Sequence, residues 1–79
     1  MSSTGLYPML GLRMIRKQRG YSQLKVAMDL SISREALSYY ENGQRSPDVQ
    51  MLLRLSDYFH VSIDYLIRGK EYDVMWEKE

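Results

Sequence analysis

The sequence predicts an all-α fold: a compact bundle of five short helices followed by a short C-terminal extension. Apolar residues recur at three- and four-residue spacing in successive segments, which is the pattern of helices that bury one face. No segment alternates apolar and polar residues cleanly enough to be a strand. With 79 residues, the chain can form one domain with a modest core and is too short for two.

The first two predicted helices are short and separated by a glycine. The first runs from about Met9 to Arg19, and Gly20 provides its C-terminal stop. The second begins after Ser22, whose hydroxyl can cap the free amides of the first turn. Its inward stripe consists of three apolar residues, Val26, Ala27 and Leu30.

The third predicted helix begins after a cap at Ser33 and ends at Gly43. Its inward positions are Ala36, Leu37 and Tyr40. This leaves an outward face that combines donors, acceptors and one aromatic ring: Arg34, Glu35, Ser38, Tyr39 and Asn42.

The fourth predicted helix has Ser46 as its cap and Pro47 at the first helical position, where the missing N–H is not needed. It continues through Phe59. The fifth begins after Ser62 and stops at Gly69. We therefore expect a domain over residues 1–69 and a tail over residues 70–79, which packs on the domain or dimerises.

The composition excludes several classes of protein. Without cysteine there is no disulfide framework or thiolate metal site. His60 is the only histidine, and we interpret it as a helix C-terminal cap, so we expect no metal, no cofactor and no catalytic site. No apolar run approaches the roughly 20 residues of a membrane helix, and the N-terminus lacks the plan of a signal peptide. We expect a soluble, cytoplasmic protein with no membrane partner.

Charge is divided unevenly along the chain. The formal net charge is +1, but residues 1–45 carry seven basic and three acidic side chains, whereas residues 46–79 carry four basic and seven acidic ones. This asymmetry indicates a face for an anionic partner.

Two short helices joined by a tight turn, the second with polar tips outward, match the plan of a helix-turn-helix. In that plan the second helix enters the major groove of DNA. Arg34 could then donate to guanine O6 and N7, Glu35 could accept from cytosine N4, and Ser38 could do either. Tyr39 could contact a thymine methyl group or a phosphate.

Several motifs occur in a fixed order along the chain. They are Arg16 ahead of the run Gly-Tyr-Ser-Gln, Ala27 in the second helix, Tyr-Glu-Asn-Gly at the end of the third, Arg-Ser-Pro after it, and finally Val-Ser-Ile-Asp-Tyr-Leu. Together they resemble the Cro/cI-type helix-turn-helix family, also called the XRE family of bacterial and phage repressors, from Leu12 to Gly69. The resemblance implies a lambda-repressor-like DNA-binding domain that regulates transcription.

The resemblance also implies residue roles. Arg34, Glu35 and Tyr39 occupy base-reading positions. Contacts to phosphates are implied for Gln23, Asn42, the Gly43 amide, Gln44 and Arg45. Arg16 and Glu41 match a largely buried structural ion pair. The family usually has glycine where this chain has Ser31, and a left-handed backbone there would cost serine on the order of 1 kcal/mol.

We therefore expect a sequence-specific binder of double-stranded DNA, a repressor that acts as a homodimer on an inverted-repeat operator. The dimerisation candidates are Ile63, Tyr65, Ile67 and Trp76. Two alternatives stay open: the antitoxin of a toxin-antitoxin pair, or a protein-interaction module that has lost DNA binding.

Overall fold

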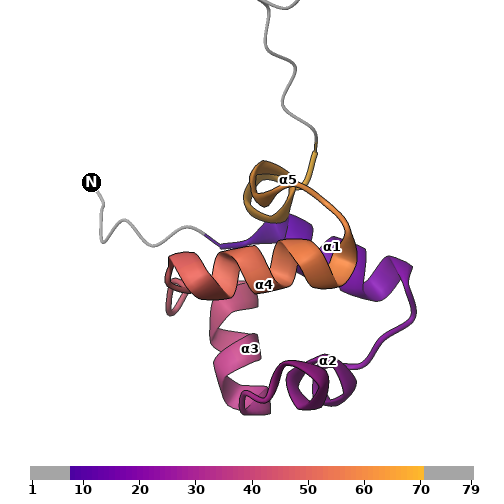
Figure 1. Cartoon of the computed structure of the whole chain (residues 1–79), viewed down its shortest axis with the longest axis vertical. Helices are drawn as coiled ribbons and strands as arrows, with labels where there is room; N and C mark the ends of the chain where they lie inside the picture. Colours follow the sequence, from indigo (N-terminus) through magenta and orange to yellow (C-terminus); the bar gives the residue numbers. More distant parts are fainter. Residues whose placement is uncertain (1–7, 71–79) are drawn as a thin grey trace, which may run out of the picture.

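The computed structural model describes residues 8–70, and within them the fold is all-helical. The helices are α1 (Leu10–Gln18), α2 (Gln23–Leu30), α3 (Arg34–Asn42), α4 (Val49–Phe59) and α5 (Ile63–Arg68). Figure 1 shows α4 crossing the middle of the molecule, with α5 above it and α2 and α3 below it. The predicted five-helix fold is confirmed. No described helix has the length and apolar character needed to cross a membrane.

A single core joins all five helices. α1 packs against α3 and α5, α2 packs against α3, and α4 packs against α5. The core consists of nine buried apolar side chains, to which every helix contributes: Met9, Leu12, Ile15, Val26, Leu30, Leu37, Leu55, Phe59 and Leu66.

Three helices begin at the predicted serine caps. The hydroxyl groups of Ser22, Ser33 and Ser62 each accept a hydrogen bond from the backbone amide three residues later, at 2.9–3.0 Å. Two helices end at the predicted glycines, because Gly43 and Gly69 adopt the left-handed conformation. Local capping chemistry thus defines most of the helix boundaries.

The predicted start of the fourth helix was wrong. Asp48 is the cap of α4, and its carboxylate accepts from the Met51 amide at 2.9 Å, so the helix begins at Val49. A carboxylate at this position also interacts favourably with the helix dipole. Pro47 precedes the helix and lines a small apolar depression together with Leu52 and Ile67.

α1 and α5 approach each other so closely that only glycine fits between them. A Cβ atom on Gly11 would lie 1.6 Å from the carbonyl oxygen of Tyr65. The α5 backbone therefore rests directly on α1, which fixes the position of the C-terminal end of the described chain.

Candidate nucleic-acid interface

The turn between α2 and α3 sets the angle between these helices. Ser31 is the C-cap of α2 and adopts the left-handed conformation, with φ 60° and ψ 41°. The Ile32 amide donates to the Ala27 carbonyl at 3.0 Å. Arg54 of α4 donates through Nη2 to the carbonyl oxygen of Leu30, at 2.7 Å. The turn has the backbone that glycine favours, and a side chain of α4 holds it in place.

The first turn of α3 exposes the two charged residues for which we predicted base reading from the sequence. Arg34 and Glu35 are both exposed. Within residues 8–70, neither side chain has a hydrogen bond or ion pair. Ser38 and Tyr39, one turn later on the same face, are half-buried. The polar atoms of Arg34 and Glu35 are therefore available to an external partner.

Tyr39 and Arg45 form one unit at the C-terminal end of α3. The Arg45 guanidinium lies over the Tyr39 ring, 5.4 Å from its centroid, a cation–π geometry. The amides of Gln44 and Arg45 both donate to the Tyr39 carbonyl, at 2.9 and 3.3 Å. These three residues line one shallow depression. The tyrosine ring thus orients a cation beside the outward face of α3.

A polar hollow lies where α1, α2 and α3 meet. Its three basic side chains, Arg13, Arg16 and Lys17, all come from α1. The other residues that line it are Gln23, Ser38, Glu41 and Asn42. Within the described part of the chain, Arg13 and Lys17 have no ion-pair partner. This arrangement suits a phosphate, because two cations and several donors converge on one space.

The expected ion pair between Arg16 and Glu41 is present beneath this hollow. Nε of Arg16 lies 2.5 Å from Oε2 of Glu41, and Nη2 donates to Oε1 at 3.0 Å. Nη1 of Arg16 donates to the Tyr21 carbonyl at 2.9 Å. Both side chains are nearly buried, at 9% and 4% exposure. The pair links α1 to α3.

Gln23 joins the same network. Its Nε2 donates to Oε1 of Glu41 at 3.1 Å. A side-chain amide has two N–H groups, so the second remains available to a phosphate. As the first residue of α2, Gln23 also has a backbone amide without an intrahelical partner.

Asn42 and Gly43 are already engaged at the end of α3. The Asn42 side-chain amide, oriented to satisfy its neighbours, donates to the carbonyls of Ser38 and Tyr39, at 2.6 and 3.3 Å. Gly43 is buried, and its amide donates to the Tyr40 carbonyl. A Cβ atom added to Gly43 would lie 2.9 Å from the backbone nitrogen of Pro8. A phosphate contact by either residue would require these bonds to be exchanged.

Sequence reasoning missed Arg13 and Lys17. They lie four residues apart and so share one face of α1, which was the available signal. Their proximity to Gln23 and Ser38 depends on how three helices pack, and no local pattern reports it.

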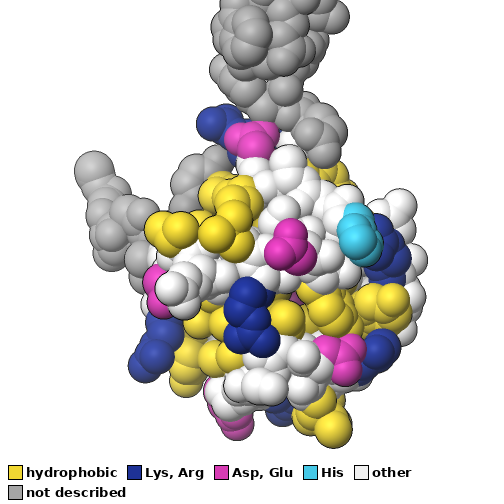
Figure 2. All heavy atoms as spheres, in the orientation of Figure 1, with side chains coloured by type: hydrophobic (Ala, Val, Ile, Leu, Met, Phe, Trp, Pro, Cys, Tyr) yellow, Lys and Arg dark blue, Asp and Glu magenta, His cyan; other side chains and the backbone are white. Residues whose placement is uncertain are grey.

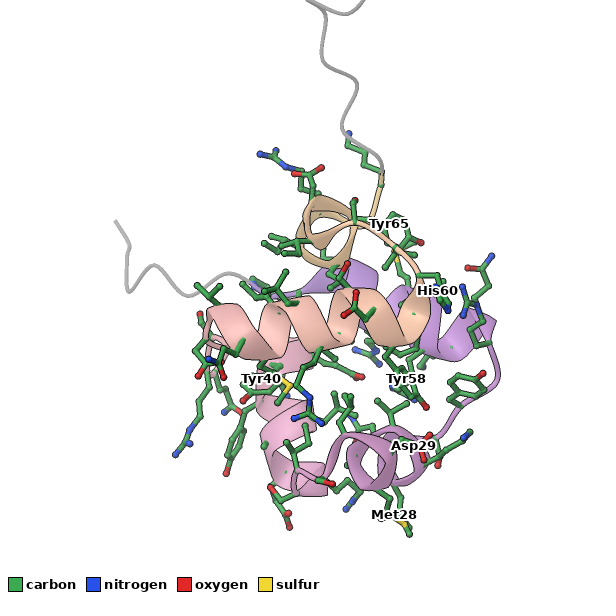
Figure 3. All side chains as sticks on the ribbon, viewed as in Figure 1. Met28, Asp29, Tyr40, Tyr58, His60 and Tyr65 are labelled. Atoms are coloured by element: carbon green, nitrogen blue, oxygen red, sulfur yellow. The ribbon has the colours of Figure 1, made fainter. Side chains whose placement is uncertain are left out.

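On another side of α2, a charged network ties this helix to α4. Lys25 donates to Asp29 at 2.9 Å, and the Tyr58 hydroxyl of α4 donates to the same carboxylate oxygen. Figure 3 shows Asp29 and Tyr58 facing each other across the two helices. The Tyr58 hydrogen bond, followed by that of Lys25, lowers the pKa of Asp29. The hydrogen bond to Asp29 raises the pKa of Lys25, and burial followed by the Asp29 contact raises the pKa of Tyr58.

The dimerisation candidates divide between two sides of α5. Ile63 and Ile67 lie one turn apart on one side, whereas Tyr65 falls on another side because helical neighbours two residues apart diverge. All three are half-buried. Trp76 lies outside the described residues. Figure 2 shows hydrophobic side chains gathered over the first half of α4 and over α5, and exposed Val49 and Leu53 belong to α4.

Comparison with known proteins identifies relatives of this arrangement. A family model described as helix-turn-helix matches residues 12–66. The HTH-type transcriptional regulator ImmR of Bacillus subtilis (strain 168) is 43% identical over 60 residues, which cover 76% of this chain and 46% of ImmR. YqaE of the same organism, named as an uncharacterized HTH-type transcriptional regulator, is 37% identical over 68 residues, covering 86% of this chain and 59% of YqaE.

A solved structure has the same fold. The crystal structure of a transcriptional regulator from Listeria innocua aligns with a TM-score of 0.67 at 34% identity, covering 81% of this chain and 59% of that one. This chain spans about half the length of the curated relatives it matches. These findings confirm the family resemblance that the sequence motifs predicted.

Proposed function

Because the chain belongs to the helix-turn-helix family of DNA-binding transcriptional regulators, we propose that it reads a specific duplex sequence through α3 and represses transcription as a homodimer. One observation carries this proposal. Arg34 and Glu35 are exposed and unpaired within residues 8–70, at the start of the second helix of the motif, where base edges are contacted.

The chemistry of α3 defines what each side chain does. Arg34 donates two hydrogen bonds to a guanine, and Glu35 accepts one from a cytosine amino group. Ser38 is half-buried one turn later and adds a single hydrogen bond to a base or a phosphate. Tyr39 supports Arg45 through the ring contact at 5.4 Å and touches the DNA with its edge.

Phosphate contacts flank the recognition helix on two sides. On one side are Arg13, Lys17 and the free N–H of Gln23, which line the polar hollow. On the other side are Gln44 and Arg45. Contacts of this kind set the position of α3 on the duplex and carry no sequence information themselves.

The proposed dimer uses the apolar surface over α4 and α5. Val49 and Leu53 are 69% and 51% exposed, and Ile63 and Ile67 lie on the adjoining helix. A twofold-symmetric dimer would place two recognition helices in successive major grooves, about 34 to 36 Å apart. Bound at a promoter, it would exclude polymerase. Leu53→Asp should give a monomer in sedimentation and weaken repression of a reporter that carries the selected operator.

The base-reading assignment is tested by selection of bound duplexes from a random pool at about physiological salt, where non-specific binding is weak. The expected product is an inverted repeat. Arg34→Ala should cost about 1 to 3 kcal/mol at that site and flatten the preference at one base position.

Lys17→Ala is the matched control for a lost cation. It should weaken binding to all sequences alike. The slope of the logarithm of the binding constant against the logarithm of the salt concentration should fall in magnitude by about 1. An unchanged preferred sequence in Arg34→Ala would refute the placement of α3 in the groove, and a pool without enrichment would refute sequence-specific binding itself.

A further inference from the structure

An apolar strip on α1 lies beside the point where the described chain ends. Leu10 and Met14 are one turn apart, and they are 52% and 51% exposed. A Cβ atom built on Gly69 would lie 3.2 Å from Sδ of Met14 and 3.5 Å from Cβ of Leu10. The chain therefore leaves α5 directly next to this strip.

Two of the basic residues of the polar hollow border the strip on its other side. Residues three and four apart are neighbours on a helix, so Arg13 and Lys17 flank Leu10 and Met14. α1 carries no acidic residue, and within residues 8–70 these two cations have no ion-pair partner. Across α1, an apolar surface thus passes directly into a positive one.

Residues 71–79 have the complementary composition. The segment reads EYDVMWEKE, with apolar Tyr72, Val74, Met75 and Trp76 among four carboxylates and one lysine. Nine residues can extend about 30 Å, whereas the nine-residue α1 is about 13 Å long. The segment is therefore long enough to reach every point of the strip and of the basic border.

We propose that residues 71–79 dock on α1 of the same chain, with apolar side chains on Leu10 and Met14 and carboxylates against Arg13 and Lys17. Charge complementarity and the position of Gly69 select this occupant. The docked segment competes with DNA, a consequence that rests on the proposed function, because it occupies two cations that contact phosphate. By linkage, bound DNA must displace the segment to the same extent.

Docking is tested in the absence of DNA through Trp76, the single tryptophan of the chain. In the intact protein its emission should lie at shorter wavelength, and be less accessible to a soluble quencher, than in a peptide of residues 71–79. Met14→Ser should shift the emission toward that of the peptide. Met28→Ser is the matched control, since Met28 is 68% exposed on α2, away from α5 in Figure 3.

Helix content measured by circular dichroism should be the same in both variants. Leu10→Ser provides a second variant with the same expected shift. Peptide-like emission in the intact protein, or equal emission in the two methionine variants, would overturn docking. Emission that moves to longer wavelength on dilution would overturn docking within one chain and assign the strip to a second copy.

The competition is tested by DNA affinity. Met14→Ser should bind duplex DNA about fivefold or more tightly than the intact protein at low salt, and Met28→Ser should not differ. This difference in DNA affinity should shrink at high salt, because screening weakens the contacts between the carboxylates of the segment and the cations of α1. Equal affinities would overturn competition. Emission is measured without DNA, so the docking test does not depend on the proposed function. If the protein did not bind DNA at all, the emission result would still show whether the segment docks.

Discussion

At the scale of single residues, Glu41 joins the three helices that form the candidate interface. It is buried and binds Arg16 of α1 and Gln23 of α2. One carboxylate thereby links three helices and orients the amide that is proposed to hold a phosphate. A buried ion pair contributes little net stability over apolar residues, but removing one partner leaves an uncompensated charge.

Replacing Glu41 alone should therefore destabilise the protein more than replacing both Arg16 and Glu41. Glu41→Leu should lower the free energy of unfolding by about 3 to 5 kcal/mol, because Arg16 stays buried without its partner. The double variant Arg16→Met with Glu41→Leu should recover most of this loss in urea denaturation. It should also bind all DNA sequences more weakly, since Gln23 loses its acceptor. A double variant as unstable as the single one would contradict the charge explanation.

At the scale of elements, the α2–α3 unit depends on a strained turn that α4 supports. Ser31 adopts φ 60°, where a Cβ atom is unfavourable, and Arg54 bonds the carbonyl just before it. The sequence signalled the strain, because a serine stands where the resembling family has glycine. The Arg54 contact appears only when α4 lies across the turn.

Ser31→Gly should stabilise the protein by up to about 1 kcal/mol, since glycine adopts the left-handed conformation without strain. Thermal unfolding of the variant measures this gain. Ser46→Gly is the control, because Ser46 is exposed and has a negative φ; it should be neutral or destabilising. The DNA sequence preference of Ser31→Gly should not change. A loss of stability in this variant would show that the serine side chain is needed in the turn.

At the scale of the whole molecule, α4 connects the α2–α3 unit to the rest of the bundle. Arg54 and Tyr58 hold α2 from one side. Arg19, at the end of α1, donates to the carbonyl of Phe59 at 2.8 Å. Tyr58 also packs edge-on against Phe59, with ring centroids 4.8 Å apart. The orientation of the α2–α3 unit therefore depends on polar contacts along α4.

The Tyr58–Asp29 contact makes part of this stability dependent on pH. The pKa of Asp29 is lowered, so its contribution is complete above the ordinary value of 3.8 and is lost as pH falls through the folded value. The pKa of Tyr58 is raised, so its contribution is complete below the ordinary value of 10.0 and is lost as pH rises through the folded value.

Tyr58→Phe should therefore be less stable than the natural chain over the whole neutral range. The difference in the free energy of unfolding should shrink below pH 3.8 and above pH 10.0. Chemical denaturation across this range measures it. Tyr65→Phe serves as the control, because the Tyr65 hydroxyl makes no hydrogen bond within residues 8–70. A difference that stayed constant with pH would exclude the Asp29 contact as its source.

The sequence by itself determined the five helices, the serine and glycine boundaries of most of them, and the outward face of α3. These features are local, since capping and helical periodicity act over three or four residues. The start of α4 was misjudged because two capping signals, Ser46 and Asp48, compete within three residues. Only the tertiary structure brought Arg13 and Lys17 next to Gln23. It also decided the contact of Gly11 with α5, because these arrangements depend on the distances between helices far apart in the sequence.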